Sequence, residues 1–365
     1  MLVVCQGLEL SDAFLRVSKA ISNKITNPIL EGIKIVAEDG TLTMSATDTE
    51  LSIEKKIKAD VKVEGETVVP GRFITEFVKK LTNSEIELEL NEKNQMIIRY
   101  EDSESIIQCY NPVEYPGFKK VQSEEFFGIS KKDFKSVVTK CIFSVALEDS
   151  RPILKGVLFD INNKELNVVA LDGYRLARIK KQIVSNIKKS IVVPSRSLNE
   201  ISKLIDENDD IINVYIDEYT IMIDLGDTKV TSRLLEGDYM NYKQIIPVNY
   251  ETFVIVNKEQ FVEALERATL LLRSAQNNYV KFDIKENNIC ITSNSELGNV
   301  KENIPVTVAG KDLLISFNPR YFLECLRVNP NEFIKICFNE ASNPCVIVPT
   351  EDDEFLYLIL PVRFM

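Results

Sequence analysis

Apolar and polar residues alternate in short runs along the chain, which predicts β-strands joined by tight turns. Residues 33–44 alternate in this way on both sides of Asp39-Gly40, the pattern of a β-hairpin. Asn162-Asn163 and Asn287-Asn288 stand at the corresponding places further along the chain. Because asparagine tolerates a positive φ, these pairs predict turns of the same kind.

Segments with helical periodicity lie between the predicted strands. One kind of helix is expected to start near a polar residue that precedes a phenylalanine by three or four positions: Ser11, Ser130 and Asn257. A second kind is expected to start at a proline, which suits the first turn of a helix: Pro70, Pro194 and Pro319. The pattern therefore predicts helices combined with antiparallel sheet.

The pattern repeats with a spacing of 124 residues. Residues 69–81 resemble residues 193–205 and 318–327, and Pro28-Ile-Leu-Glu-Gly32 recurs as Pro152-Ile-Leu-Lys-Gly156. This spacing is too long for a solenoid unit and suits a domain with its own core. We therefore predict three copies of one α+β domain, over residues 1–125, 126–250 and 251–365.

Charged residues recur at i, i+4 and i+7 in the second helix of each copy, opposite an apolar face. The positions are Arg72, Glu76 and Lys79; Arg196, Glu200 and Lys203; Arg320, Glu324 and Arg327. A ladder of salt bridges within each helix is one interpretation. The threefold recurrence favours another, a basic surface that meets a polyanion without reading its sequence.

Composition narrows the function. The chain of 365 residues is 45% hydrophobic and has a net charge of −11 and no histidine, so catalytic triads and metal sites that need imidazole are excluded. Its seven cysteines are scattered without a C-x-x-C motif, which indicates reduced thiols and a cytoplasmic protein. No apolar run is long enough to cross a membrane.

Nucleotide-binding glycine loops are absent, and we expect no enzyme activity, cofactor or metal. One alternative is a metal-dependent nuclease that uses Asp48, Glu50 and Asp172, because two-metal sites need clustered carboxylates. The repeat argues against it, since Asp48 and Asp172 occupy equivalent places in different copies. An aspartate that serves a turn explains both residues.

The sequence resembles the beta subunit of bacterial DNA polymerase III, the sliding clamp family, over its full length. Leu171-Asp-Gly-Tyr-Arg-Leu-Ala177 is similar to the family pattern T-D-G-H/Y-R-L-A, and Leu360-Pro-Val-Arg363 to its M-P-M/V-R ending. The resemblance implies the DNA clamp fold, in which a head-to-tail homodimer of six domains forms a ring around double-stranded DNA. Such a ring confers processivity in DNA replication.

The resemblance also implies partners and sites. The replicative DNA polymerase, the clamp loader and other proteins would bind through a short peptide motif in a pocket between the second and third domains. The pocket positions are Leu154, Leu171, Gly173, Tyr174, Arg175, Leu176, Met240, Ile245, Leu358, Leu360, Pro361, Val362 and Arg363. Arg175 and Arg363 are expected to hold peptide carbonyls or a terminal carboxylate.

The recurring helix cations, together with Lys24 from the resemblance, are the predicted DNA-binding residues: Lys24, Arg72, Lys79, Lys80, Arg196, Lys203, Arg320 and Arg327. The implied dimer interface includes Ile106, Leu270 and Leu271.

Overall fold

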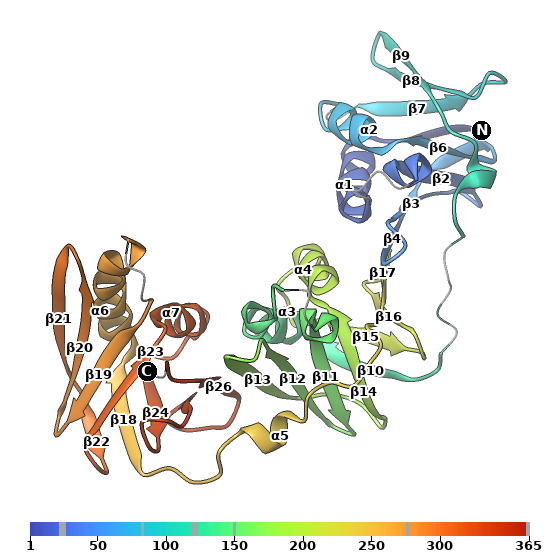
Figure 1. Ribbon diagram of the computed structural model, residues 1–365. Coiled ribbons are helices and arrows are strands. Elements are labelled where there is room, and N and C mark those ends of the chain that lie inside the picture. The colour runs from blue at the N-terminus through green and yellow to red at the C-terminus, as the bar shows by residue number, and fades with distance from the viewer. Residues whose placement is uncertain are drawn as a thin grey trace. The chain divides into compact units, whose positions relative to one another are not determined.

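The computed structural model describes residues 1–21, 27–81, 84–117, 121, 123–148, 151–274 and 278–362. The chain forms two compact units (Figure 1). The N-terminal unit contains Met1–Lys131 and Arg196–Leu234, and the C-terminal unit contains Lys132–Ser195 and Leu235–Met365. The division into residues 1–125, 126–250 and 251–365 stays a prediction.

The N-terminal unit holds two antiparallel sheets. The five-stranded sheet has the order β5 (Asp60–Val63), β1 (Leu2–Gln6), β7 (Glu85–Leu90), β8 (Gln95–Tyr100), β9 (Ser103–Gln108). The eight-stranded sheet has the order β10 (Phe126–Ser130), β15 (Ile211–Ile216), β16 (Thr220–Asp224), β17 (Thr228–Arg233), β4 (Leu51–Lys58), β3 (Thr41–Thr47), β2 (Gly32–Glu38), β6 (Gly65–Pro70).

The C-terminal unit also holds two antiparallel sheets. The nine-stranded sheet has the order β14 (Lys188–Pro194), β11 (Gly156–Asn162), β12 (Glu165–Leu171), β13 (Arg175–Gln182), β26 (Phe355–Ile359), β25 (Cys345–Val348), β24 (Phe333–Phe338), β18 (Thr252–Asn257), β22 (Thr307–Ala309). The four-stranded sheet has the order β21 (Gly298–Pro305), β20 (Asn288–Ser295), β19 (Val280–Lys285), β23 (Leu313–Phe317).

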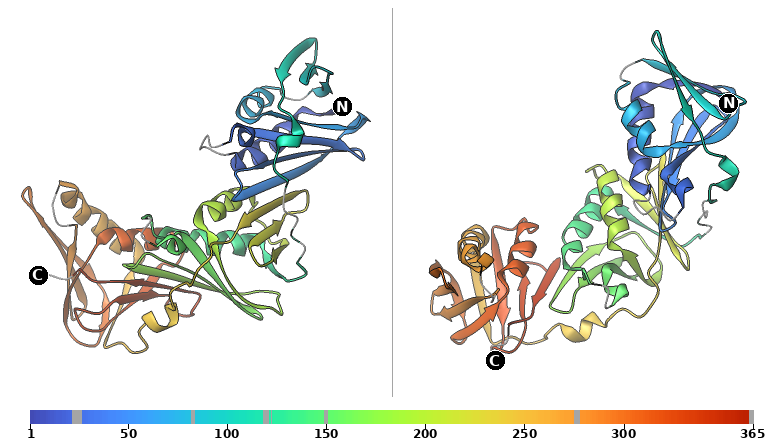
Figure 2. Two further views of the ribbon diagram at one scale, coloured as in Figure 1. Left: turned by 45° about the vertical axis from the view of Figure 1, so that its right-hand side comes forward. Right: turned by 45° about the horizontal axis from the view of Figure 1, so that its top comes forward.

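Helices accompany these sheets. The α-helices are α1 (Gly7–Val17), α2 (Gly71–Val78), α3 (Lys131–Thr139), α4 (Ser195–Leu204), α5 (Tyr242–Ile245), α6 (Lys258–Leu270) and α7 (Pro319–Arg327). The 3-10 helices are η1 (Ser18–Ala20), η2 (Pro28–Glu31), η3 (Pro112–Glu114), η4 (Ile142–Ser144), η5 (Pro152–Lys155) and η6 (Leu271–Ser274). Helices α1 and α2 pack together in the N-terminal unit, and α6 and α7 pack together in the C-terminal unit (Figures 1 and 2).

The local turn predictions are confirmed. Asp39 and Gly40 have φ angles of 47° and 70°, and Asn163 and Asn287 have φ angles of 55° and 60°, each between two paired strands. Asn257 caps α6 by accepting a hydrogen bond from the backbone N–H of Gln260, as predicted. These positions are set by local backbone chemistry.

The predicted cap at Ser11 is wrong. Helix α1 begins at Gly7, so Ser11 lies inside the helix. The helix starts earlier because β1 ends at Gln6, and the backbone N–H of Gly7 then bonds to the carbonyl of Ser84. Tertiary contacts thus override a cap signal in the sequence.

The core of each unit lies between helices and sheets. In the C-terminal unit four phenylalanines from α6, β19, β23 and α7 pack with ring centroids 5.1–5.9 Å apart: Phe261, Phe282, Phe317 and Phe322. Full burial of one such side chain contributes about 1.5–3 kcal/mol. The apolar faces predicted for the helices therefore pack inward.

Both large sheets continue from one sequence repeat into the next. In the first junction β17 pairs with β4, and in the second junction β13 pairs with β26. Strands β4 and β13 have the same length and are 124 residues apart in sequence. Consecutive repeats therefore share a hydrogen-bonded sheet. This arrangement is the predicted mixture of helix and antiparallel sheet.

Candidate functional site

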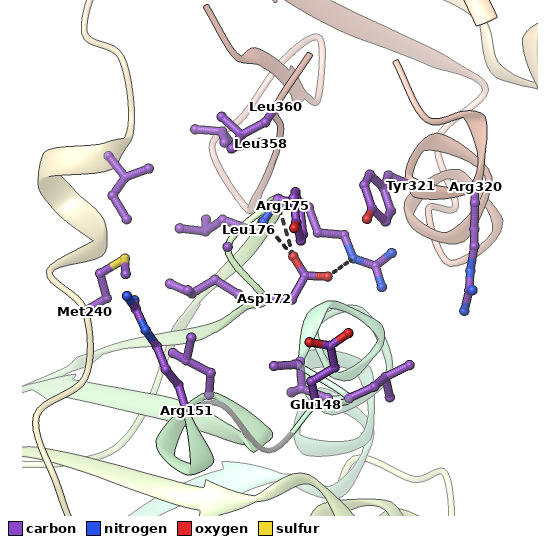
Figure 3. Close-up of a pocket in the computed structure, with 18 residues that line it drawn as sticks. Glu148, Arg151, Asp172, Arg175, Leu176, Met240, Arg320, Tyr321, Leu358 and Leu360 are labelled. Atoms are coloured by element: carbon purple, nitrogen blue, oxygen red, sulfur yellow. Dashed lines mark hydrogen bonds and ion pairs between the residues drawn. The ribbon is translucent and has the colours of Figure 1, made fainter. Parts of the chain in front are cut away.

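A cavity of about 690 Å³ opens beside the second junction (Figure 3). Its lining is apolar toward the sheet and carries five charged side chains. The lining residues are Val145, Ala146, Leu147, Glu148, Arg151, Leu154, Leu171, Asp172, Gly173, Tyr174, Arg175, Leu176, Met240, Ile245, Arg320, Tyr321, Leu358 and Leu360. A concave, largely apolar site with a few charged groups suits a peptide or another small ligand.

The turn between β12 and β13 shapes the wall of this cavity. Asp172 Oδ1 accepts hydrogen bonds from the backbone N–H groups of Tyr174, at 2.9 Å, and Arg175, at 3.0 Å. Gly173 adopts a φ of 93°, a backbone conformation that side chains disfavour. The turn aims Tyr174 outward, and the Tyr174 carbonyl accepts a hydrogen bond from the backbone N–H of Leu360.

Arg175 is bound by the chain itself. Its Nε donates to Asp172 at 3.0 Å, its Nη1 to Glu324, and its Nη2 to the Phe143 carbonyl at 2.5 Å. The guanidinium also lies 4.7 Å from the ring centroid of Tyr321 (Figure 3). Arg175 thus donates from each of its three nitrogens to partners within the chain, and its side chain is 7% exposed. That Arg175 holds peptide carbonyls stays a prediction.

Glu324 receives a second arginine. Its Oε1 accepts from Nε of Arg320 at 2.6 Å, while its other oxygen accepts from Arg175. Burial opposes the charged form of Glu324, but the hydrogen bonds from Arg320 and Arg175 outweigh burial and lower its pKa. Glu324 is therefore charged at neutral pH.

The structure brings most of the predicted pocket residues together, and it adds others. Pro361 and Val362 do not line the cavity, and the backbone N–H of Val362 bonds to the carbonyl of Ser316 instead. Arg363 lies outside the described residues. Sequence reasoning missed residues 145–148, Arg151 and Tyr321. No local signal marked them, because they come from a connecting segment and from a helix of the third repeat.

The predicted DNA-binding positions lie on helices α2, α4 and α7 or just after α2, except for Lys24, which lies outside the described residues. The exposed members are Arg72, Lys79, Lys80, Arg196, Lys203, Arg320 and Arg327. Ile74 and Val78 of α2, by contrast, are buried. The charged faces of the helices are therefore solvent-accessible within each unit.

Carboxylates accompany these cations. Lys203 pairs with Glu200 at 2.7 Å and Arg320 with Glu324 at 2.6 Å within their own helices. Arg196 pairs instead with Asp48 at 2.6 Å, and Arg327 with Glu266 at 2.9 Å. The predicted ladder within each helix is thus present only in part. Both partners are exposed only in the pair of Arg327 and Glu266, and an exposed pair contributes about 0–1 kcal/mol, so a polyanion can compete for Arg327. The carboxylates of the other three pairs are more buried, while their cations are exposed.

Sequence models of one family match nearly the whole chain. The DNA polymerase III beta subunit N-terminal domain matches residues 1–119, the central domain residues 128–241 and the C-terminal domain residues 243–363. The chain belongs to the DNA polymerase III beta subunit family. This membership confirms three tandem clamp domains as the fold class.

Relatives of the chain agree with it in sequence and structure. The Beta sliding clamp of Bacillus subtilis is 35% identical over 360 residues, 95% of each chain, and that of Staphylococcus epidermidis 33% over 356 residues, 94% of each. The crystal structure of the DNA polymerase sliding clamp from Bacillus subtilis matches with a TM-score of 0.97 at 33% identity, over 100% of both chains. The beta subunit from Thermotoga maritima matches with a TM-score of 0.93 at 29% identity, over 100% of both.

The predicted interface residues are accessible. Ile106 lies on β9 and is 57% exposed, and Leu270 ends α6 and is 60% exposed. Leu271 follows in η6 and is half-buried. Sequence reasoning missed Phe73, which is 56% exposed on α2 and stacks on Phe77 with ring centroids 5.9 Å apart. A phenylalanine next to the charged positions of an amphipathic helix is a sequence signal for a contact surface.

The alternative nuclease site finds no support in the described residues. Asp48 Oδ1 accepts from the backbone N–H groups of Glu50 and Leu51, as Asp172 does in its own turn, so both aspartates serve turns. Across the described ranges, no group of three His, Cys, Asp or Glu side chains is placed to hold a metal ion. All seven cysteines are buried free thiols.

None of the described helices is both long and apolar enough to span a membrane.

Proposed function

We propose that this chain is a non-enzymatic DNA sliding clamp, which encircles double-stranded DNA as a homodimer and tethers the replicative polymerase. One observation carries the proposal: exposed cations recur at equivalent places on α2, α4 and α7 in a chain of net charge −11. Phosphate binding that ignores sequence needs point charges and little else. The relatives named as sliding clamps support the same function.

A ring needs a contact between two copies of the chain, and we infer that two edges of its sheets form this contact. Among the described strands, β9 and β21 each pair on one side only and lie at the edges of sheets in different units. Ile106 on β9 and Leu270 beside β21 supply exposed apolar groups. Edge strands join readily when another edge meets them, so a head-to-tail contact between these edges would close a ring.

Partner proteins are proposed to bind in the cavity beside the second junction. Leu154, Leu176, Ile245 and Leu358 form an apolar lining in which leucine or phenylalanine side chains of an extended peptide fit. The polymerase, the clamp loader and other replication proteins would then share one site. Two sites on one dimer would raise the effective affinity of a bivalent partner.

The test is retention of the purified protein on closed circular DNA, after its loader has placed it there. A ring is expected to stay on closed circles and to slide off after linearisation. Reversal of Arg72, Arg196 and Arg320 to glutamate should lower retention, whereas reversal of the exposed strand lysines Lys229 and Lys285 should not. Retention on linear DNA equal to that on circles would contradict encirclement.

The same samples test the remaining parts of the proposal. With Mg²⁺ or Mn²⁺ present, the DNA is expected to stay intact, and cleavage lost in Asp48→Ala would contradict a non-enzymatic clamp. Leu270→Asp combined with Leu271→Asp should give a folded monomer by light scattering. A dimer in this variant would show that the contact between copies lies elsewhere.

A further inference from the structure

Glu324 links the pocket to the solvent-exposed face of α7. One of its oxygens accepts from Arg175, which lines the pocket wall and is bound to Asp172, and the other accepts from Arg320 at 2.6 Å. The four side chains form one chain of ion pairs, Asp172 to Arg175 to Glu324 to Arg320. Two carboxylates and two guanidiniums balance each other.

Accessibility changes along this chain of ion pairs. The side chain of Arg175 is 7% exposed, that of Glu324 is 23% exposed and that of Arg320 is 65% exposed. An anion that arrives from solvent therefore meets Arg320 first. Because Arg320 also lines the cavity, its loss would change the charge of the pocket wall directly.

Arg327, the other exposed arginine of α7, is not part of this chain of ion pairs. Arg327 is 61% exposed, nearly as much as Arg320, but it pairs with Glu266 of α6 at 2.9 Å and does not line the cavity. The two arginines therefore offer a matched comparison. Each can bind a phosphate group, but only Arg320 is joined to the pocket through Glu324.

We propose that Glu324 is a positioning residue that couples the pocket to Arg320, so that a DNA phosphate held by Arg320 weakens the binding of acidic peptides. A phosphate group that draws Arg320 away leaves Asp172 and Glu324 with Arg175 as their shared cation. The pocket wall then carries one excess negative charge. A carboxylate on the peptide is repelled by this charge, whereas a neutral peptide of the same shape is not.

This coupling rests on the proposed function, since it needs both DNA at Arg320 and a peptide in the pocket. It gives the clamp a means of distinguishing partners: acidic peptides bind better when Arg320 is free, and neutral peptides bind equally in both states. By thermodynamic linkage, a bound acidic peptide should weaken the hold of Arg320 on phosphate by the same factor.

The experiment measures fluorescence anisotropy of two labelled peptides on the full-length protein, with and without saturating duplex DNA at one ionic strength. The peptides contain leucine and phenylalanine and differ only in one aspartate or asparagine. We expect duplex DNA to lower the affinity of the aspartate peptide about five- to tenfold, the lower end of the usual coupling between sites, and to leave the asparagine peptide nearly unchanged.

Variants separate the coupling from general repulsion by DNA. Arg320→Gln should bind the aspartate peptide weakly already without DNA and respond little to DNA, whereas Arg320→Lys should keep part of the response. In Arg327→Gln, saturating duplex DNA should lower the affinity of the aspartate peptide as much as it does in the unchanged protein. A full response in Arg320→Gln, or an equal loss in Arg327→Gln, would overturn the inference.

Retention of duplex and binding of the asparagine peptide are recorded in the same samples. If both occur and DNA leaves the aspartate peptide unaffected, the coupling is wrong and the clamp function stands. If the unchanged protein binds neither duplex nor peptide, the proposed function fails, and the coupling fails with it.

Discussion

In the first junction Ser52 lies opposite Thr231, whereas in the second junction Leu176 lies opposite Leu358. Both junctions have the same antiparallel pairing. Each is preceded by an aspartate, Asp48 or Asp172, that accepts hydrogen bonds from two backbone N–H groups. One junction therefore has polar side chains where the other has the apolar side of a pocket. The shared backbone does not decide which junction can bind a peptide.

The ion pairs of the two junctions differ because of the residue at the start of the shared strand. Strand β4 begins with buried Leu51, and β13 begins 124 residues later with Arg175. Without an arginine at the strand start, Asp48 pairs directly with Arg196 at 2.6 Å. In the second junction Arg175 takes the aspartate and also Glu324, so the equivalent helix arginine pairs with Glu324 instead. A single residue type thus redirects the ion pairs.

The first junction has its own buried cation. Lys55 on β4 is 7% exposed and pairs with Asp227 at 2.6 Å, beside a smaller cavity of about 340 Å³. Burial opposes ionisation of Asp227, but the hydrogen bonds from Lys55 and Thr228 outweigh it and lower its pKa. The residue equivalent to Lys55 in the second junction is the buried Ile179, so a buried ion pair of the first junction corresponds to an apolar contact in the second.

The largest effect is expected from Arg175→Leu, which gives the second junction the residue of the first. Loss of the guanidinium leaves two poorly exposed carboxylates with one cation fewer, at a cost of about 3 kcal/mol in the free energy of unfolding. Urea unfolding followed by circular dichroism measures this cost. Arg178→Leu on the same strand is the control, with an expected cost of about 1 kcal/mol or less.

The pH dependence of the same variant sharpens the comparison. The pKa of Glu324 is lowered in the folded protein, so its stabilising contribution is present above the ordinary glutamate pKa and is lost as the pH falls through the folded value. The difference between Arg175→Leu and the unchanged protein should therefore shrink at acidic pH. A difference that stays constant would show that the lost contacts are mainly those with the aromatic rings.

An intermediate effect is expected from Leu360→Arg. The backbone N–H of Leu360 bonds to the carbonyl of Tyr174, as that of Arg233 bonds to Glu50, so arginine is the residue of the first junction at this place. Leu360 is 36% exposed, and the change should leave folding intact. Loss of its apolar contact should weaken a neutral leucine peptide about tenfold, or ~1.4 kcal/mol. Leu360→Met should bind normally, and equal loss in both would show that Leu360 does not contact the peptide.

The smallest effect is expected from the turn glycine and its counterpart. Thr49 has a φ of 78° where the second junction has Gly173 at 93°. Because a β-branched residue is strained in this region, Thr49→Gly should stabilise the protein by up to about 1 kcal/mol, whereas Gly173→Thr should destabilise it by about 1–2 kcal/mol. Thermal unfolding checks both signs. The backbone N–H of residue 49, which donates to Thr47, is kept in this variant. Destabilisation by Thr49→Gly would therefore mean that the greater freedom of glycine in the unfolded chain outweighs the relief of strain.

Local patterns predicted the elements well where the backbone alone decides. The turns at Asp39-Gly40, Asn163 and Asn287 follow from residues that tolerate positive φ. The predicted start of α1 at Ser11 was wrong because pairing of β1 in the sheet decides where the helix begins. The pocket was predicted from a family resemblance, and its members from residues 145–148 and α7 were missed because no local pattern links segments so distant in sequence.

The sequence by itself determined the repeat of 124 residues, the hairpin turns and the amphipathic helices, because these depend on residue spacing and on preferences of the backbone. Only the tertiary structure decided what each charge does. Arg175 and Glu324 are 149 residues apart in sequence, yet they form an ion pair in the pocket wall, where Arg175 is bound within the chain. Ion pairs between distant segments depend on which side chains folding brings within a few ångströms, and spacing along the chain does not encode that proximity.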